Sequence, residues 1–195
     1  SSTPGSESGL PPRGPVPTAR SPLALLSNRS RRCRHRLRCA FTEAFDQARE
    51  RLWLTTPYFA PDRRSQRALC GAARRGVDVR VLVPGKSDVP RAAYAHMLDA
   101  GVRIWEYQPR VLHAKTALVD RGWATVGTAN FDYRSFFLND EINLLGQAPA
   151  LNATLAEHFV LDLAESREVL KAAWRQRPWY APALELIGWW ARRWL

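Results

Sequence analysis

The sequence predicts an α/β domain whose β-sheet is covered by helices on both faces. Two observations support this prediction. From about residue 35 to residue 174, short runs of β-branched and aliphatic residues alternate with longer amphipathic segments, a pattern typical of a sheet with helices on both sides. This stretch is also long enough to bury one hydrophobic core, so a single folded domain is expected.

Two helix-and-strand units are expected in the first half of the domain. The apolar residues of the stretch 35–51 repeat on one side of a helix, and the apolar run 52–55 that follows predicts a strand. The Ala- and Arg-rich stretch 64–75 predicts a second helix, which Gly76 ends before the strand 77–83.

The second half continues the alternation. A third helix is expected near residues 89–99, and Gly101 separates it from the strand 102–107. Beyond the segment that carries the candidate site, the sequence predicts a strand over residues 141–145 and a long helix over residues 151–174.

A β-hairpin is expected between these parts. Residues 111–119 are rich in β-branched and aliphatic residues and predict a buried strand, on which side-chain alternation puts His113 and Lys115 on the same face. A turn follows, and residues 123–126 predict the returning strand. The hairpin then brings residues 127–130 beside that face.

The spacing H-x-K-x4-D-x6-G-T-x-N is the most informative feature of the chain. A chance match of all its positions is improbable, on the order of one in a hundred thousand. An imidazole attacks phosphorus or moves a proton near neutral pH, and fixed ammonium and amide donors stabilise the extra charge of a pentacoordinate phosphorane. The motif therefore predicts phosphodiester chemistry that requires no divalent metal. Its residues are His113, Lys115, Asp120, Gly127, Thr128 and Asn130.

Each candidate residue also has a simpler interpretation. A single His in a strand, such as His113, is usually a core or surface residue. A buried Lys is rare because its charge is costly to desolvate, so Lys115 on the same face, together with Asn130, favours the functional interpretation. The acidic Glu141 further along the chain is either part of the site or an exposed charge at a strand edge.

The motif and its surroundings resemble a known family. The stretch from residue 113 to residue 144, HAKTALVDRGWATVGTANFDYRSFFLNDEINL, is similar to the HKD motif of the phospholipase D superfamily, and its second part resembles bacterial cardiolipin synthases. The stretches TPYFAP at 56–61 and RGVDV at 75–79 resemble the second half of those enzymes. The resemblance covers roughly residues 30–170 and implies a phospholipase D-like domain, with a mixed sheet flanked by helices.

The resemblance implies roles for the motif residues. In the superfamily one motif histidine becomes a phosphohistidine, and the histidine of a second motif protonates the leaving alcohol. In the second half of such an enzyme, His113 is the general acid and base. Lys115, Thr128 and Asn130 are then expected to bind the substrate phosphate.

Two acidic residues complete the implied catalytic set. Asp120 is expected to orient the site. Glu141 matches the acidic residue that family members place at the other ring nitrogen of the histidine, where a carboxylate fixes the tautomer and stabilises the imidazolium.

Only half of such a site is present in the chain. Of the four histidines, only His113 is followed by Lys two residues later. The second HKD motif is therefore expected from an identical chain in a homodimer, or from the missing N-terminal half of a longer protein. No metal site and no cofactor are expected, because Cys33, Cys39 and Cys70 lack the number and spacing of a closed metal site.

The two ends of the chain differ in composition from the domain. Residues 1–30 are predicted to be a disordered linker or a truncated junction, because residues 1–22 hold six Pro, three Gly and five Ser. The catalytic domain is expected over residues 31–175. Residues 176–195 predict a Trp- and Arg-rich amphipathic segment, which lies in the headgroup layer of a membrane or packs against the domain.

The net charge of +11 predicts an anionic partner. Six Arg fall between residues 29 and 38, where they can contact phosphates of lipid headgroups or of nucleic acid. The Trp residues near the C-terminus favour a membrane surface. Few aromatic residues interleave with the Arg cluster, so nucleic acid is not the expected partner.

Together these features predict a phosphatidyltransferase of the cardiolipin synthase type, which passes a phosphatidyl group between phospholipids through a phosphohistidine. The expected substrate is an anionic phospholipid similar to phosphatidylglycerol, at the cytoplasmic side of a bacterial inner membrane. Three alternatives remain open: a phospholipase D hydrolase, a homodimeric single-motif nuclease, and an inactive membrane-binding half-domain.

Overall fold

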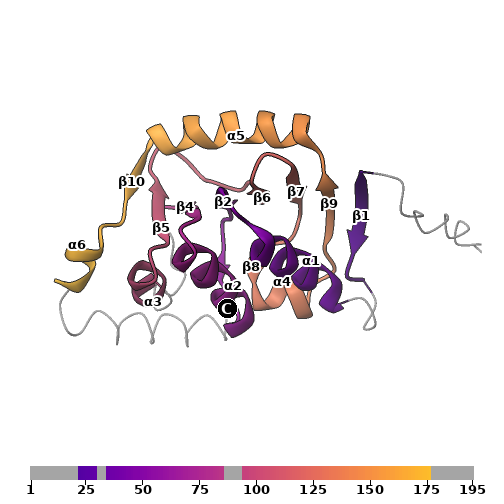
Figure 1. Ribbon diagram of the computed structural model, residues 1–195, viewed down its shortest axis with the longest axis horizontal. Helices are drawn as coiled ribbons and strands as arrows, with labels where there is room; N and C mark the ends of the chain where they lie inside the picture. The colour runs from indigo at the N-terminus through magenta and orange to yellow at the C-terminus, as the bar shows by residue number, and fades with distance from the viewer. Residues whose placement is uncertain (1–21, 30–33, 86–93, 177–195) are drawn as a thin grey trace, which may run out of the picture.

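The computed structural model describes residues 22–29, 34–85 and 94–176, and a mixed eight-stranded β-sheet lies at its centre (Figure 1). In spatial order the strands are β1 (Leu23–Ser27), β9 (Ile142–Gln147), β7 (Trp123–Gly127), β6 (Thr116–Val119), β2 (Arg51–Thr55), β4 (Asp78–Pro84), β5 (Arg103–Tyr107) and β10 (Ser166–Glu168). A second, two-stranded sheet pairs β3 (Phe59–Ala60) with β8 (Phe131–Asp132).

Helices lie on both faces of the large sheet (Figure 1). One face is covered by α5 (Pro149–Ala164), and the other by α1 (Arg34–Gln47), α2 (Arg63–Arg74) and α3 (Tyr94–Asp99). Two short helices, α4 (Tyr133–Phe137) and α6 (Lys171–Arg175), complete the described elements. The predicted α/β class and the mixed sheet are confirmed.

Side-chain alternation along the central strands builds a separate hydrophobic core on each face. On β2, Leu52 and Leu54 pack in the core that α1 and α2 cover. Trp53 points to the opposite face, where its ring stacks on Phe159 of α5 with 4.9 Å between the ring centroids. Because both faces of β2 are buried, its sequence is a continuous apolar run rather than an alternating one.

The directions of the strands determine where their ends meet. β2, β4 and β5 are parallel, and α2 and α3 lie between them in the chain. β6 and β7 form the predicted hairpin, and β6 is antiparallel to β2. The C-terminal ends of β2 and β4 therefore lie at the edge of the sheet where β6 begins and β7 ends.

The predicted strand 111–119 is shorter in the structure. β6 begins only at Thr116, which is the first residue with partners on both sides, Thr55 in β2 and Val126 in β7. Val111 is 88% exposed, so the apolar run before Thr116 is not a buried strand. The prediction that His113 lies on a strand was wrong, because residues 111–115 form no strand in the structure.

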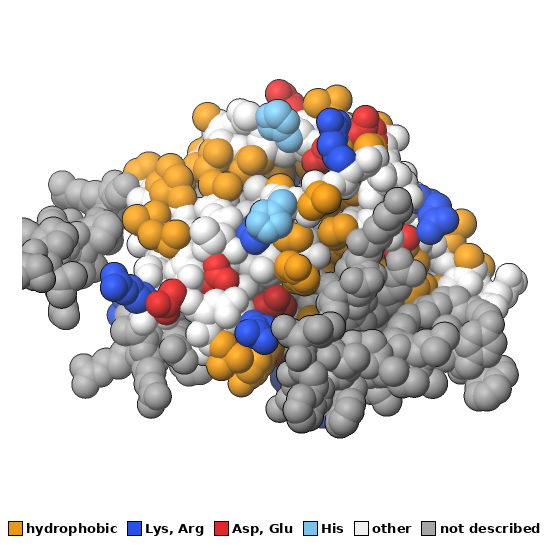
Figure 2. Space-filling view, turned by 180° about the vertical axis from the view of Figure 1, so that it is seen from behind, with side chains coloured by type: hydrophobic (Ala, Val, Ile, Leu, Met, Phe, Trp, Pro, Cys, Tyr) orange, Lys and Arg blue, Asp and Glu red, His pale blue; other side chains and the backbone are white. Residues whose placement is uncertain are grey.

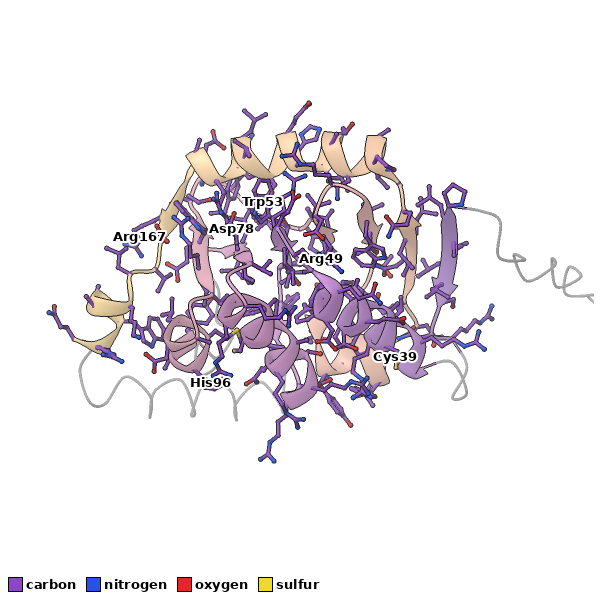
Figure 3. All side chains as sticks on the ribbon, in the orientation of Figure 1. Cys39, Arg49, Trp53, Asp78, His96 and Arg167 are labelled. Carbon is purple, nitrogen blue, oxygen red and sulfur yellow. The ribbon has the colours of Figure 1, made fainter. Side chains whose placement is uncertain are left out.

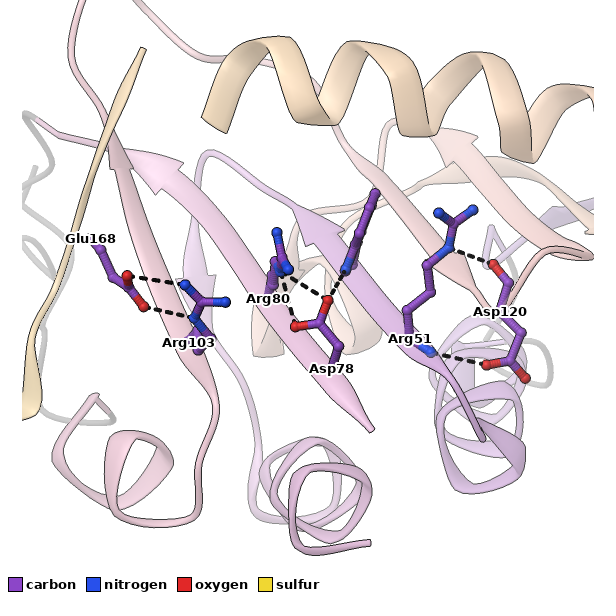
Figure 4. Close-up of polar contacts among 7 residues, drawn as sticks. Arg51, Asp78, Arg80, Arg103, Asp120 and Glu168 are labelled. Atoms are coloured by element: carbon purple, nitrogen blue, oxygen red, sulfur yellow. Dashed lines mark hydrogen bonds and ion pairs between the residues drawn. The ribbon is translucent and has the colours of Figure 1, made fainter. Parts of the chain in front are cut away.

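The predicted helix 151–174 is interrupted. α5 ends at Ala164, and the chain then adds β10 to the outer edge of β5. Arg103 of β5 forms a two-pronged ion pair with Glu168 of β10, at 2.8 and 3.1 Å, which fixes the added strand (Figure 4). Sequence periodicity did not indicate this change, because it depends on a contact with a strand about 60 residues earlier.

The predicted linker over residues 1–30 was wrong in its last part. Residues 23–27 form β1, which pairs antiparallel with β9, and Asn28 is fully buried. A Cβ at Gly146 of β9 would lie 2.1 Å from the carbonyl oxygen of Pro22, so this strand pair approaches closely. The apolar residues that follow the Pro- and Ser-rich stretch thus supply an edge strand.

Other predictions fall outside the described residues. These are the remainder of the proposed linker, the helix 89–99 before Tyr94, and the amphipathic segment beyond residue 176. None of the described helices combines the length and the apolar character that crossing a bilayer requires.

Candidate functional site

The candidate site lies at the edge of the sheet where β6 begins and β7 ends. His113 and Lys115 precede β6, and residues 128–130 follow β7. Because the two strands are antiparallel neighbours, the hairpin brings both segments to one edge. This grouping is the one that the motif spacing predicts.

His113 and Lys115 form a close pair at this edge. The ammonium nitrogen Nζ of Lys115 lies 3.3 Å from both ring nitrogens of His113, and it donates a hydrogen bond to the His113 carbonyl oxygen at 2.9 Å. Lys115 is only 9% exposed, whereas the imidazole of His113 is exposed. Figure 2 shows the face of the molecule seen from behind, on which histidine, basic and acidic side chains lie among apolar ones. An open imidazole thus has a cation held beside it.

The charge of Lys115 is affected by its surroundings. Burial lowers the pKa of Lys115, and the negative charge of Glu141 acts in the opposite direction. A phosphate group next to Lys115 adds a second negative charge and favours the ammonium form further.

The close approach of β7 and β9 explains the glycine of the motif. A Cβ at Gly127 would lie 2.3 Å from the carbonyl oxygen of Ile142 and 2.6 Å from the Cα of Asn143. Neither backbone atom can move away without breaking the strand pair. Gly127 therefore lets the chain pass β9 and places Thr128 beside Glu141.

The carboxylate of Glu141 is the most heavily hydrogen-bonded group of the site. It is 8% exposed, and it accepts a hydrogen bond from the hydroxyl of Thr128 at 2.5 Å. The hydroxyl of Ser135 donates to its other oxygen at 3.0 Å, and Nδ2 of Asn139 lies 3.4 Å away. The carboxylate is therefore held in one position from several sides.

The hydroxyl of Thr128 already forms hydrogen bonds within the chain. Its hydroxyl donates to Glu141 and accepts a hydrogen bond from the backbone N–H of Ile142 at 3.0 Å. A hydroxyl has a single proton to donate, so Thr128 cannot bind a phosphate oxygen while it holds Glu141. The expected phosphate contact of Thr128 therefore requires that this bond is exchanged.

Asn130 differs from Thr128 in this respect. Its backbone N–H donates to the hydroxyl of Ser135 at 3.1 Å, which fixes the main chain. Its side-chain oxygen Oδ1 is buried and has no hydrogen-bond partner among the described residues. A buried acceptor without a partner is costly, so Oδ1 of Asn130 is suited to accept a hydrogen bond from a donor group.

Two residues that were given no role in the sequence analysis belong to this network. Ser135 lies in the stretch that resembles the family, and its hydroxyl connects Asn130 with Glu141. Asn28 lies in the stretch predicted to be a linker, and it binds the main chain at Glu141 and Ser135. No sequence pattern marks Asn28, since its partners are more than 100 residues away in the chain.

The structure does not bring Glu141 to His113 through a hydrogen bond. Among the described residues the partners of the Glu141 carboxylate are Thr128, Ser135 and Asn139. The expected contact with a ring nitrogen of His113 is thus not made within this chain. That role of Glu141 stays a prediction.

Asp120 lies away from this group, at the opposite end of β6. Its carboxylate oxygen Oδ1 accepts hydrogen bonds from the backbone N–H groups of Arg49, Glu50 and Arg51, at 3.1, 2.8 and 3.2 Å. The Arg51 guanidinium also donates to the Asp120 carbonyl oxygen at 2.8 Å (Figure 4). The structure therefore places Asp120 as an anchor of the turn between α1 and β2, and not beside the imidazole.

Other titratable side chains are dispersed. Figure 3 shows Cys39 on α1 and His96 on α3, on different elements, and Cys39 and Cys70 are free cysteines. In the part of the chain that the structure describes, no three His, Cys, Asp or Glu side chains are grouped so that they could hold a metal ion.

Comparison with protein families and sequences places the chain among known relatives. Residues 41–163 match the family model described as cardiolipin synthase, PLD-like domain. The chain is 38% identical over 151 residues to a cardiolipin synthase of Halalkalibacterium halodurans, a match that covers 74% of this chain and 30% of the relative. It is 43% identical over 144 residues to cardiolipin synthase A of Pseudomonas fluorescens, covering 70% of this chain and 30% of the relative. The chain thus spans about a third of the length of these relatives.

Solved structures share the fold. Nuc from Salmonella typhimurium, a phospholipase D family member, superposes with a TM-score of 0.66 at 20% identity, over 76% of this chain and 97% of Nuc. A phosphatidylserine synthase from Haemophilus influenzae superposes with a TM-score of 0.64 at 16% identity, over 87% of this chain and 45% of the synthase. At such low identity these matches show the fold alone.

Proposed function

The chain belongs to the family of cardiolipin synthase PLD-like domains, and from this we propose that its site transfers a phosphatidyl group from one phospholipid to the hydroxyl of another. The transfer passes through a phosphohistidine, and the site acts as one half of a two-motif enzyme. One observation carries the proposal: the buried ammonium of Lys115 lies 3.3 Å from the ring nitrogens of the exposed His113.

The exposed imidazole is suited to proton transfer. In the first step, the histidine of the other motif, which this chain does not carry, forms a bond to phosphorus, and the bond from phosphorus to the headgroup oxygen breaks. His113 donates its proton to that leaving oxygen. In the second step, the hydroxyl of the acceptor lipid returns a proton to His113 as its oxygen displaces the histidine from phosphorus. His113 ends in its starting state.

Lys115 and Asn130 stabilise charge on the phosphate. The ammonium of Lys115 is held by the His113 carbonyl at 2.9 Å and needs no rearrangement to meet a phosphate oxygen at the open edge. The Nδ2 group of Asn130 is the proposed donor to a phosphate oxygen. Thr128 is a third phosphate ligand only when its proton leaves Glu141.

The second motif comes from outside this chain. The match to about a third of each cardiolipin synthase supports a longer protein, of which this chain is the C-terminal half-site. A homodimer, in which two copies each contribute one motif, satisfies the same need.

The proposed substrate is an anionic phospholipid similar to phosphatidylglycerol, which the protein meets at a membrane surface on the cytoplasmic side of a bacterial inner membrane. The net charge of +11 supports an anionic surface as partner, and the names of the sequence relatives support a phospholipid. Water as acceptor instead of a lipid hydroxyl turns the same site into a phospholipase D.

A homodimeric nuclease is the second candidate. One observation favours it: the strongly basic chain suits a polyanion. The two cardiolipin synthases compared above, at 38% and 43% identity, favour the lipid substrate.

Labelled phosphatidylglycerol tests the proposal when it is given to the assembled enzyme, meaning this chain together with a second motif. We expect cardiolipin as product, and we expect His113→Ala to lower turnover by far more than about 100-fold. His96→Ala, on α3, is the matched control and should keep full activity. Cleavage of DNA or RNA without lipid turnover supports the second candidate, and more than about one per cent of activity in His113→Ala refutes the role of His113.

A further inference from the structure

Asn28 connects the edge strand β1 to the loop that carries Glu141. The side chain is fully buried, and its Oδ1 accepts the backbone N–H of Glu141 at 2.7 Å. Its Nδ2 donates to the carbonyl oxygen of Ser135 at 2.6 Å, and its own backbone N–H donates to the carbonyl oxygen of Glu141 at 3.1 Å. One residue thus binds both ends of the segment 135–141.

Both ends of the segment 135–141 help to fix the carboxylate of Glu141. Ser135 donates its hydroxyl to Glu141 at 3.0 Å, so their main chains must stay at a fixed separation for that bond to form. Between them, Phe136 is fully buried in the core and anchors the Ser135 end of the segment, whereas Leu138, nearer to Glu141, is 51% exposed. At the Glu141 end, the side chain of Asn28 binds the main chain directly, so the position of the carboxylate depends in part on Asn28.

Asn152 is a natural comparison within the same chain. It is also fully buried, it accepts from the Arg51 guanidinium at 2.8 Å, and it donates to the carbonyl oxygen of Trp123 at 2.6 Å. Its partners lie at the opposite edge of the sheet from Lys115. Loss of Asn152 removes a buried amide of the same kind without touching the site.

We propose that Asn28 is a positioning residue, which holds Glu141 in place through the main chain of Ser135 and Glu141. Asn28 lies before the stretch 41–163 that matches the family model, so the site is completed by a residue from outside that stretch. The expected effect of Asn28 on turnover rests on the proposed phosphatidyl transfer. The expected effect of Asn28 on the position of Glu141 does not depend on that function.

Hydrogen exchange on the 195-residue chain tests the structural consequence. In Asn28→Ala, the backbone amide of Glu141 should exchange at least about tenfold faster than in the unmodified chain, because its acceptor is gone. In Asn28→Asp this amide should stay protected, because the carboxylate still accepts. Asn152→Ala should leave it unchanged. Full protection of the Glu141 amide in a folded Asn28→Ala chain overturns the proposal.

Steady-state kinetics on the assembled enzyme tests the catalytic consequence. Asn28→Ala should lower kcat and leave KM nearly unchanged, whereas Asn152→Ala should keep kcat. Asn28→Asp keeps one of the two side-chain bonds and should recover part of the rate; it also serves if Asn28→Ala does not fold. Wild-type kcat in Asn28→Asp and in any folded Asn28→Ala overturns the role.

The two measurements separate the inference from the function on which it rests. If the unmodified enzyme does not turn over phosphatidylglycerol, the proposed function fails. Exchange at Glu141 then still decides whether Asn28 holds the loop.

Discussion

At the scale of single residues, Lys115 holds a charge that the folded chain desolvates. Because burial lowers the pKa of Lys115 below its value in the unfolded chain, the charged form costs free energy in the folded state at neutral pH. We expect Lys115→Met to abolish turnover and to raise the free energy of unfolding by about 1 kcal/mol at pH 7, or about 3 °C in Tm.

The pH dependence of this gain follows from the direction of the pKa shift of Lys115. The cost is present in full below the lowered pKa, and it disappears as the pH rises from there toward the pKa of the unfolded lysine. The Tm difference between Lys115→Met and the unmodified chain should therefore shrink at alkaline pH in thermal unfolding. Lys171→Met, which removes an exposed charge paired with Asp99, is the control. A lower Tm of Lys115→Met at pH 7 would contradict the desolvation argument.

At the scale of elements, the turn between α1 and β2 depends on Asp120. Its carboxylate binds three backbone N–H groups, and its φ of 49° lies in the left-handed region that Asp tolerates better than Ala. We expect Asp120→Ala to lower the free energy of unfolding by about 2 kcal/mol, while the folded fraction keeps its turnover. Chemical denaturation and activity below the transition measure the two effects.

Asp120→Asn distinguishes an anchor from a catalytic group. The amide keeps an acceptor for the turn and tolerates the positive φ, so the loss of stability should be smaller than in Asp120→Ala. An Asp120→Asn chain of unchanged stability but strongly reduced kcat would assign Asp120 to the chemistry instead.

The pairing of β7 with β9 depends on Gly127. A Cβ there meets the backbone of β9, so Gly127→Ala should lower the free energy of unfolding by about 1 to 3 kcal/mol. Gly71→Ala is the matched control, because Gly71 lies inside α2 with space for a methyl group and should stabilise by about 0.5 to 1 kcal/mol. Denaturant titration of both variants checks the contrast. Equal changes in the free energy of unfolding would show that β7 and β9 can move apart to accommodate the methyl group at little cost.

At the scale of the whole molecule, the basic charge and the Trp residues near the C-terminus predict binding to anionic membranes. We expect vesicles containing anionic lipid to shift Trp emission to the blue, and deletion of residues 182–195 to remove most of the binding. Salt should weaken the part that depends on the Arg cluster at 29–38 and affect Trp insertion much less.

The same experiment distinguishes binding to a membrane surface from binding to nucleic acid. A nuclease should ignore the vesicles and bind DNA or RNA in a way that salt weakens steeply. Measuring the binding of both ligands to one preparation therefore decides whether the protein, with its net charge of +11, binds the anionic membrane or the nucleic acid.

Local patterns predicted much of the fold. The helix expected at 64–75 is α2, at 63–74, because its apolar period, its Asp62 cap and the positive φ of Gly76 all lie within the one local stretch 62–76. The hairpin and the grouping of His113 with Lys115 were also predicted, since a turn joins neighbouring strands. The start of β6 and the end of α5 were not, because they depend on which strands lie alongside.

By itself, then, the sequence determined the α/β class, the hairpin and the family, since each follows from residue spacing along a short stretch. Only the tertiary structure decided that Asp120 anchors a turn, that Thr128 and Ser135 hold Glu141, and that Asn28 completes the site. The reason is physical: Asn28 and Glu141 are 113 residues apart, and their bond exists only because β1 pairs with β9. The periodicity of a sequence does not predict a hydrogen bond between strands that only folding brings together.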